Sequence, residues 1–135
     1  MLSQKRLEYY VKLFNNQPGK PTPCSNQIVT CAIITHDREK AIQVMNEKNA
    51  IIKKVSYNDI DWELNNERWI WRNWNENHRG YRFYKVIVDP NISEDLFRYM
   101  VVKSSFYCCS MEVMDDKVIS KVKRGDMFDT ELGAI

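Results

Sequence analysis

The chain has 135 residues, of which 44% are hydrophobic, 12% aromatic and 28% charged. This length is typical of one domain with one core, and this composition excludes disorder over most of the chain. Twenty basic and 18 acidic side chains leave a net charge of +2, which excludes a nucleic-acid binder that relies on bulk positive charge alone.

The N-terminal 26 residues predict one helix and one loop. Residues 3–15 place apolar side chains on one helical face behind Ser3, a candidate N-cap. These apolar residues are Leu7, Tyr10, Val11 and Phe14. Residues 16–26 contain three prolines and one glycine, which predict an irregular loop. Charges within residues 1–14 exclude a signal peptide, and no apolar run reaches the roughly 18 residues of a membrane span.

The next segment predicts a strand, a helix and a second strand. Residues 27–35 are almost continuously apolar and β-branched, which is typical of a central strand buried on both faces. Residues 37–50 have the pattern of a helix capped by Asp37. Its inward-facing residues would be Ala41, Val44 and Met45. Residues 51–57 predict a second strand.

Residues 67–89 hold three tryptophans, two tyrosines, one phenylalanine and four arginines. On a strand, Trp69 and Trp71 share one face, and the turn-forming residues 75–80 would join this strand to another at 81–89. We therefore predict an aromatic hairpin. A helix over residues 59–74 is the alternative, because plausible capping residues begin that segment.

The C-terminal part predicts a helix, a strand and a charged tail. Ser93 is a candidate N-cap, and Leu96, Phe97 and Met100 would form the inner face of the helix. Residues 104–114 alternate as a strand does, and residues 115–135 are charged and weakly patterned. The basic residues of this tail are outnumbered by its acidic ones, which favours a solvated face.

In chain order these elements make a ferredoxin-like β-α-β-β-α-β plan. The plan carries an extra N-terminal helix and an aromatic-rich hairpin or helical insertion between its second and third strands. We expect one α+β domain over residues 1–135, with its core at 27–114. The segments outside that core are the N-terminal helix at 1–15, the Pro-rich loop at 16–26 and the charged C-terminal segment at 115–135.

The four cysteines form no C-x-x-C pair, so the sequence predicts neither a zinc site nor a disulfide framework. We expect reduced thiols, with Cys31 and Cys109 in the core, and we expect no metal and no cofactor. Together with the missing signal peptide, this predicts a cytoplasmic protein without membrane contact. The abundance of asparagine, lysine and isoleucine is typical of low-GC genomes, including those of viruses and phages.

Residues 79–86 resemble the octapeptide of RNA recognition motifs, whose aromatic residues stack on bases. Arg79, Gly80, Tyr81 and Phe83 fit that pattern. Arg82, Tyr84 and Val86 depart from it, and the first strand lacks the aromatic residue of the partner hexapeptide. The likeness covers eight of 135 residues and assigns the chain to no family. It implies single-stranded nucleic acid as an alternative ligand, with Tyr81 and Phe83 facing away from the helices.

The leading functional hypothesis is a non-enzymatic binding or regulatory protein, an inhibitor or adaptor, whose aromatic and basic surface at 67–85 contacts a partner protein. The residues of this surface would be Arg68, Trp69, Trp71, Arg72, Arg79, Tyr81, Phe83 and Lys85. Single-stranded RNA bound by the same segment is the alternative. In the simplest interpretation, Trp62, Trp69 and Trp71 only fill the core. A homodimer that buries this segment is a third arrangement.

Enzymatic function has little support in the sequence. The chain lacks the phosphate-loop, dinucleotide-binding, zinc-protease and serine-hydrolase motifs, and it has two histidines. His36 stands beside Asp37 at the carboxyl end of the first predicted strand, where α/β proteins often bind ligands. A small enzyme with a site near His36 is therefore the second alternative. His78 falls in a predicted turn, where a polar residue is expected.

Overall fold

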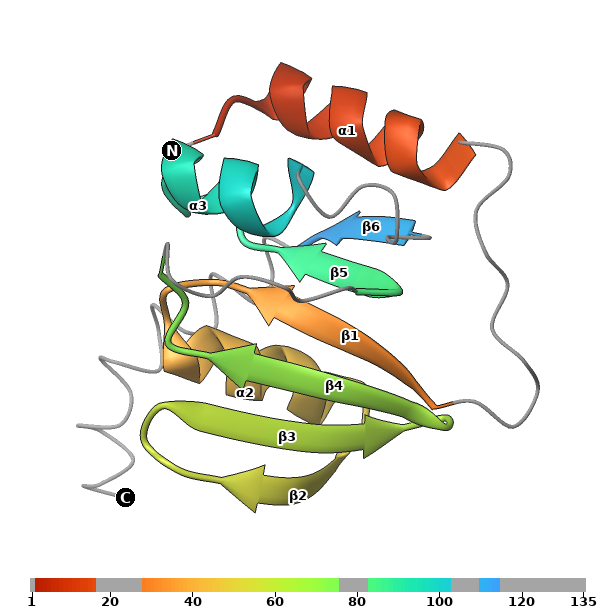
Figure 1. Ribbon diagram of the computed structural model, residues 1–135, viewed down its shortest axis with the longest axis vertical. Helices are drawn as coiled ribbons and strands as arrows, with labels where there is room; N and C mark the ends of the chain where they lie inside the picture. Colours follow the sequence, from red (N-terminus) through yellow and green to blue (C-terminus); the bar gives the residue numbers. More distant parts are fainter. Residues whose placement is uncertain (1, 17–27, 76–82, 103–109, 115–135) are drawn as a thin grey trace, which may run out of the picture.

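One mixed sheet with three helices makes up the described part of the computed structural model, which covers residues 2–16, 28–75, 83–102 and 110–114 (Figure 1). The elements are α1 (Gln4–Asn16), β1 (Val29–Ile34), α2 (Arg38–Glu47), β2 (Ile51–Val55), β3 (Asp59–Leu64), β4 (Glu67–Arg72), β5 (Lys85–Val88), α3 (Glu94–Met100) and β6 (Ser110–Val113). None of the helices in these ranges is long and apolar enough to cross a membrane.

The sheet has the order β2-β3-β4-β1-β5-β6, with β1 between two parallel neighbours, β4 and β5. β6 is parallel to β5, whereas β2, β3 and β4 form an antiparallel meander. The expected α+β class is confirmed. The ferredoxin-like plan is wrong because the strand order differs: the central strand has parallel neighbours on both sides, so the sheet resembles a doubly wound one with an antiparallel extension.

The hairpin lies at residues 59–72, not at 67–89 as the aromatic pattern predicted. β3 and β4 are joined by Asn65 and Asn66, whose φ angles are 50° and 63°. Two successive residues with positive φ make the type I′ turn that matches the twist of a hairpin, and asparagine tolerates this conformation well. β4 and β5 are not paired, because β1 lies between them. The alternative helix at 59–74 is also wrong.

Local signals predicted the helices correctly. Asp37 caps α2 by accepting hydrogen bonds from the backbone N–H groups of Glu39 and Lys40. Ser93 caps α3 by accepting from the N–H of Leu96 at 3.1 Å. The inner faces of these helices are the predicted ones: Ala41, Val44 and Met45 on α2, and Leu96, Phe97 and Met100 on α3.

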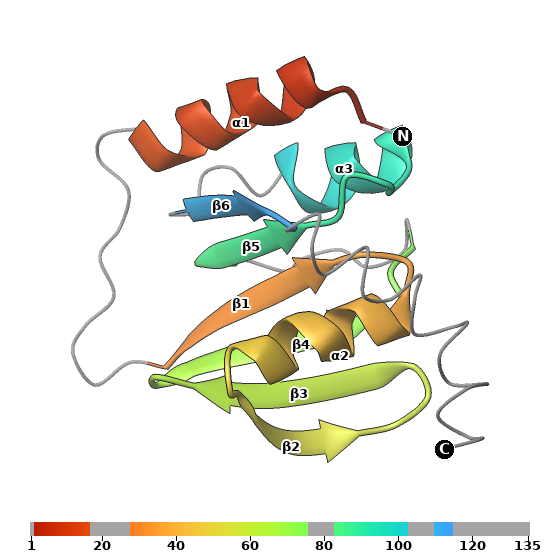
Figure 2. The same cartoon turned by 180° about the vertical axis from the view of Figure 1, so that it is seen from behind.

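The helices divide over the sheet. α2 covers the β3–β4 half from behind in Figure 1 and lies in front of it in Figure 2, whereas α1 and α3 lie together at the β5–β6 end. Lys48, which follows α2, lines the same cavity as Leu64 and Trp69, so this helix packs on the face that carries the indoles. We call this side of the sheet the α2 face and the other side of β2, β3 and β4, which α2 does not cover, the open face.

The core combines β1 with the aromatic residues. Cys31, Ala32, Ile33 and Ile34 are fully buried, which confirms the predicted central strand and the core position of Cys31. Trp62 and Trp69 are paired across β3 and β4, and Ile60 is paired with Trp71. Directly opposite residues share a face, so this layer packs towards α2.

Candidate functional site

Three of the four aromatic rings predicted to form a binding surface are described by the structure, and all three are inside the protein. Trp69, Trp71 and Phe83 are 4%, 2% and 0% exposed. The indole of Trp71 donates to the carbonyl of Thr35 at 3.0 Å, and that of Trp69 donates to Glu67 at 3.1 Å. We expected the ring of Phe83 to face away from the helices on a binding surface, and its full burial shows that it is not on such a surface. The simplest interpretation of the tryptophans, that they are core residues, is confirmed. Buried rings offer no face on which a base could stack.

The predicted arginines are engaged within the chain. Asp61, which is 8% exposed, accepts hydrogen bonds from Arg68 at 2.6 Å and from Arg72 at 2.7 Å. Burial raises the pKa of Asp61, but the hydrogen bonds and charges of Arg72 and Arg68 outweigh burial and hold this pKa below 3.8. The cluster is therefore a charge-assisted network on the open face, in which each guanidinium already has a carboxylate.

Lys85 is also paired, on the α2 face. Its ammonium lies 2.7 Å from the carboxylate of Glu67. The hydrogen bond with Glu67 raises the pKa of Lys85 above 10.5, against the opposing effect of burial. Arg79, Tyr81 and Cys109 lie outside the described residues, as does His78. Of the eight predicted site residues, Arg68 and Lys85 combine substantial side-chain exposure, 50% and 40%, with an ion pair.

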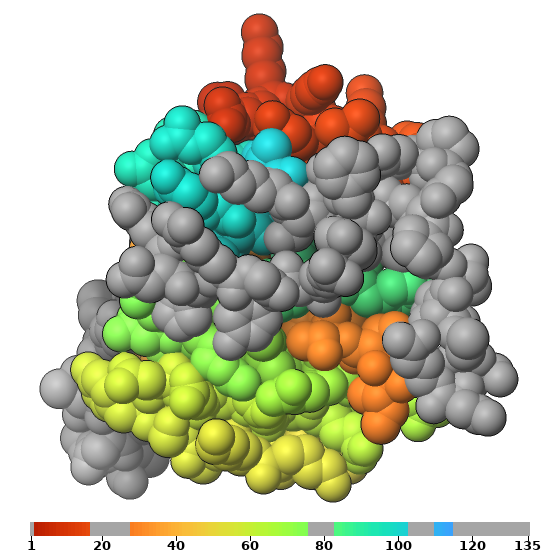
Figure 3. Space-filling view, in the orientation of Figure 1, coloured from red at the N-terminus to blue at the C-terminus, as the bar shows by residue number. Residues whose placement is uncertain are grey.

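The exposed apolar side chains gather instead on the outermost strand. All five residues of β2 are exposed. Ile51, Ile52 and Val55 are 59%, 51% and 56% exposed, and Tyr57 in the following turn is 82% exposed. Figure 3 shows this strand along the lower rim of the molecule. Among the described residues, β2 has a neighbouring strand on one side only.

The register of β2 divides its side chains between the two faces of the sheet. Ile52 is opposite Trp62 and Val55 is opposite Ile60, so both face the α2 side. Ile51 is opposite Glu63 and Lys54 is opposite Asp61, on the open face. The register shifts between Ile52 and Lys54, which makes Lys53 the extra residue of a bulge. The apolar layer of the core thus continues outward onto the exposed strand.

The opposite edge of the described sheet is covered at Met111. The side chain of Asn15 donates to the carbonyl of Met111 at 3.2 Å and accepts from its N–H at 2.9 Å. These two bonds occupy the outward backbone groups of Met111 in β6, as a neighbouring strand would. An unpaired edge invites strand pairing unless it is protected. The contrast makes β2 the edge of the described sheet that can accept another strand.

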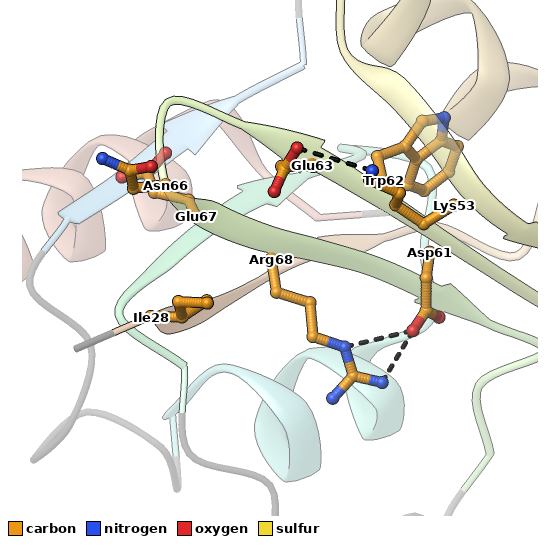
Figure 4. Close-up of a pocket in the computed structure, with 8 residues that line it drawn as sticks. All are labelled: Ile28, Lys53, Asp61, Trp62, Glu63, Asn66, Glu67 and Arg68. Carbon is orange, nitrogen blue, oxygen red and sulfur yellow. Dashed lines mark hydrogen bonds and ion pairs between the residues drawn. The ribbon is translucent and has the colours of Figure 1, made fainter. Parts of the chain in front are cut away.

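A depression of about 220 Å³ lies on the open face near β2. Figure 4 shows Arg68 extending to Asp61, with Ile28 across the depression and Lys53 and Glu63 at its other side. The indole of Trp62 points to the opposite side of β3 from the carboxylate of Asp61. The depression thus extends the exposed region of β2 onto a charged surface.

A second polar group lies where β1 and β5 end. Asp89, 2% exposed, accepts hydrogen bonds from the hydroxyl of Thr35 at 2.7 Å and from the ammonium of Lys40 at 3.1 Å. His36 is exposed beside this group. β4 and β5 are the next two parallel strands in the chain, and they lie on opposite sides of β1. The carboxyl ends of β1 and β5 therefore flank a topological switch point of the sheet. Open α/β sheets bind ligands at such points. Within the described ranges, no three His, Cys, Asp or Glu side chains are grouped to hold a metal.

Sequence reasoning did not single out the exposed strand β2. The pattern "DIDWELNNERWIWR" alternates on both sides of two asparagines, which is the signal of a short hairpin. A hairpin at residues 59–72 leaves the preceding strand, residues 51–55, as the outer strand of a three-stranded meander. The exposure of its apolar residues depends on strand order, which local pattern does not specify.

Comparisons of the chain with protein-family models, with curated proteins and with solved structures gave no match.

Proposed function

We propose that this chain is a non-enzymatic binding protein whose β2 edge takes up an extended segment of a partner polypeptide as a seventh strand. This keeps the role of inhibitor or adaptor that the sequence suggested and moves the surface from residues 67–85 to residues 51–57. The observation that carries the proposal is the exposure of Ile51, Ile52 and Val55 on a strand that, among the described residues, has a neighbouring strand on one side only.

Strand addition combines two sources of affinity at this edge. The backbone of the added segment would satisfy the outward N–H and C=O groups of β2. Its side chains would cover Ile52 and Val55, which continue the buried layer of Trp62 and Ile60. Burying apolar area stabilises a complex by about 25 cal/mol per Å², before the cost of ordering the partner.

The test is a pull-down from the native cell with wild type and an Ile52→Lys plus Val55→Lys variant. Charges at these exposed positions should abolish recovery of specific partners without unfolding the chain, as judged by tryptophan fluorescence. Tyr9→Lys plus Leu13→Lys on α1 is the matched control, since these residues are 56% and 40% exposed. Recovery of the same partners by the β2 variant would refute the proposal.

Some of the residues predicted to bind nucleic acid are not available to a ligand. Phe83 is fully buried, and Arg68 and Arg72 neutralise Asp61 instead of standing free for phosphates. Fluorescence titration with short single-stranded oligonucleotides tests what is left of it. Unchanged emission at about 100 μM protein and low salt would exclude stacking by this segment.

A site near His36 is the second candidate function, and the switch point between β1 and β5 favours it. Asp89 and Lys40 would supply two charged groups, and the exposed His36 would supply an imidazole. A thermal-shift screen of small anionic metabolites, repeated with His36→Gln, tests this candidate. Ligands that stabilise wild type and not the variant would support it.

A further inference from the structure

We propose that the segment added to β2 is two-faced, with apolar side chains on the α2 face and acidic side chains on the open face. This inference rests on the proposed strand addition and deepens it by naming the chemistry of the partner. It follows from which side chains β2 presents on each side of the sheet.

On the α2 face the strand offers an apolar surface. Ile52 and Val55 are about half exposed, and they lie beside the buried Trp62 and Ile60 across β3. Side chains of an added strand project alternately to the two faces. Every second residue of the partner would therefore lie beside Ile52 or Val55, where only an apolar side chain avoids an uncompensated cost of desolvation.

On the open face the strand offers the positive charges of Lys53 and Lys54, next to the exposed Ile51. Lys53 lies 3.7 Å from Glu63, with both side chains about half exposed, so this ion pair is weak. The side chain of Lys54 is exposed, and its ammonium makes no hydrogen bond or ion pair within the described residues. It lies opposite Asp61, whose carboxylate is already shared by Arg68 and Arg72. A carboxylate on the partner would be the natural neighbour of Lys54.

The same charges disfavour a second copy of this chain as the occupant. If two β2 strands paired antiparallel across a twofold axis, full overlap would place Lys53 opposite Lys53 of the other copy. A shift by one residue in one direction would place Lys53 opposite Lys54, and a shift in the other direction would place Lys53 opposite Ile52. Like charges directly opposite one another destabilise strand pairing, and lysine on an edge strand is a known protection against self-association. An acidic strand would instead place negative charges opposite Lys53 and Lys54, which favours pairing.

Three synthetic nine-residue peptides test the inference. Each alternates valine with one other residue: glutamate, serine or lysine. Binding is measured by NMR, from the amide shifts of residues 51–55 of the full chain at low salt, with peptide up to about 1 mM. The glutamate peptide should bind about tenfold more tightly than the lysine peptide, with serine between them, and added salt should reduce the difference.

A charge-reversed chain is the decisive control. Lys53→Glu plus Lys54→Glu should invert the order, so that the lysine peptide binds best. Equal binding of all three peptides to β2 would overturn the acidic chemistry while supporting strand addition. A concentration-dependent dimer in sedimentation that Ile52→Lys plus Val55→Lys dissolves would overturn it in favour of a second copy. If no peptide shifts the β2 amides and the chain is monomeric, strand addition itself fails.

Discussion

The side-chain amide of Asn15 pairs with both backbone groups of Met111, and this contact distinguishes the two edges of the sheet. The carbonyl of Met111 accepts at 3.2 Å and its N–H donates at 2.9 Å. A residue at the end of α1 thereby covers the outer edge of β6 at Met111, while β2 has nothing equivalent among the described residues. An asymmetry of this kind suits a protein that takes up a strand at one edge only.

Asn15→Ala should lower the free energy of unfolding by about 1–2 kcal/mol, because two part-buried hydrogen bonds are lost. Asn16→Ala is the matched control, since Asn16 is exposed at the same helix end and gains the same helix propensity. Urea unfolding of both variants measures the difference. Equal stabilities would mean that water replaces Asn15 at no cost.

Two buried tryptophans should respond differently to the same replacement. Trp71 donates its indole N–H to Thr35, whereas the indole N–H of Trp62, which is also buried, has no hydrogen-bond partner in the described part of the chain. Replacement by phenylalanine removes an indole N–H that is hydrogen-bonded at Trp71 and one that is not hydrogen-bonded at Trp62. We expect Trp71→Phe to be the more destabilising by about 1–2 kcal/mol, as measured by urea unfolding. Equal losses would indicate that Trp62 has a partner in solution.

Acid should weaken the chain partly through Asp61. Its pKa is lower in the folded chain than the ordinary 3.8, so its contribution to stability is present above that value and is lost as pH falls through the folded pKa. The stability difference between wild type and Asp61→Asn should therefore be constant at neutral pH and shrink below about pH 4. Urea unfolding between pH 7 and 2.5 tests this, with the exposed Asp95→Asn as control. Parallel curves would contradict it.

High pH should lower the stability of the folded chain partly by deprotonating Lys85. Because Glu67 raises its pKa above 10.5 in the folded chain, the stabilisation is present below that value and is lost as pH rises through the folded pKa. Glu67→Gln should lower the pKa of Lys85, as read from an NMR titration of its side chain. Glu63→Gln, on the neighbouring strand, should leave it unchanged. A pKa that does not respond to Glu67→Gln would refute the pairing in solution.

The buried pair at the ends of β1 and β5 should be strongly coupled. The side chains of Lys40 and Asp89 are 12% and 3% exposed. Lys40→Met would leave a buried carboxylate without its cation and should cost about 3 kcal/mol. Adding Asp89→Asn should recover part of that loss, since the charge itself is removed. Additive effects of the two replacements in urea unfolding would show that the pair is not coupled.

Local signals in the sequence were sufficient for much of the secondary structure. These signals involve only a few neighbouring residues each. They are the capping oxygens of Asp37 and Ser93, the apolar spacing of α1 and the β-branched run of β1. Their effects do not depend on what lies across the molecule. The hairpin at Asn65 and Asn66 is also a local feature, and it was missed because the neighbouring tryptophans suggested a different pairing.

The amino-acid sequence by itself determined where helices begin, which residues alternate and that the aromatic content suffices for a core. Only the tertiary structure decided that β1 separates β4 from β5, that Trp69 and Trp71 lie beneath α2, and that the apolar residues of β2 face solvent. The physical reason is that periodicity assigns a side chain to a face of its strand, whereas burial depends on the strand's neighbours. Those neighbours are selected by contacts between segments far apart in the chain.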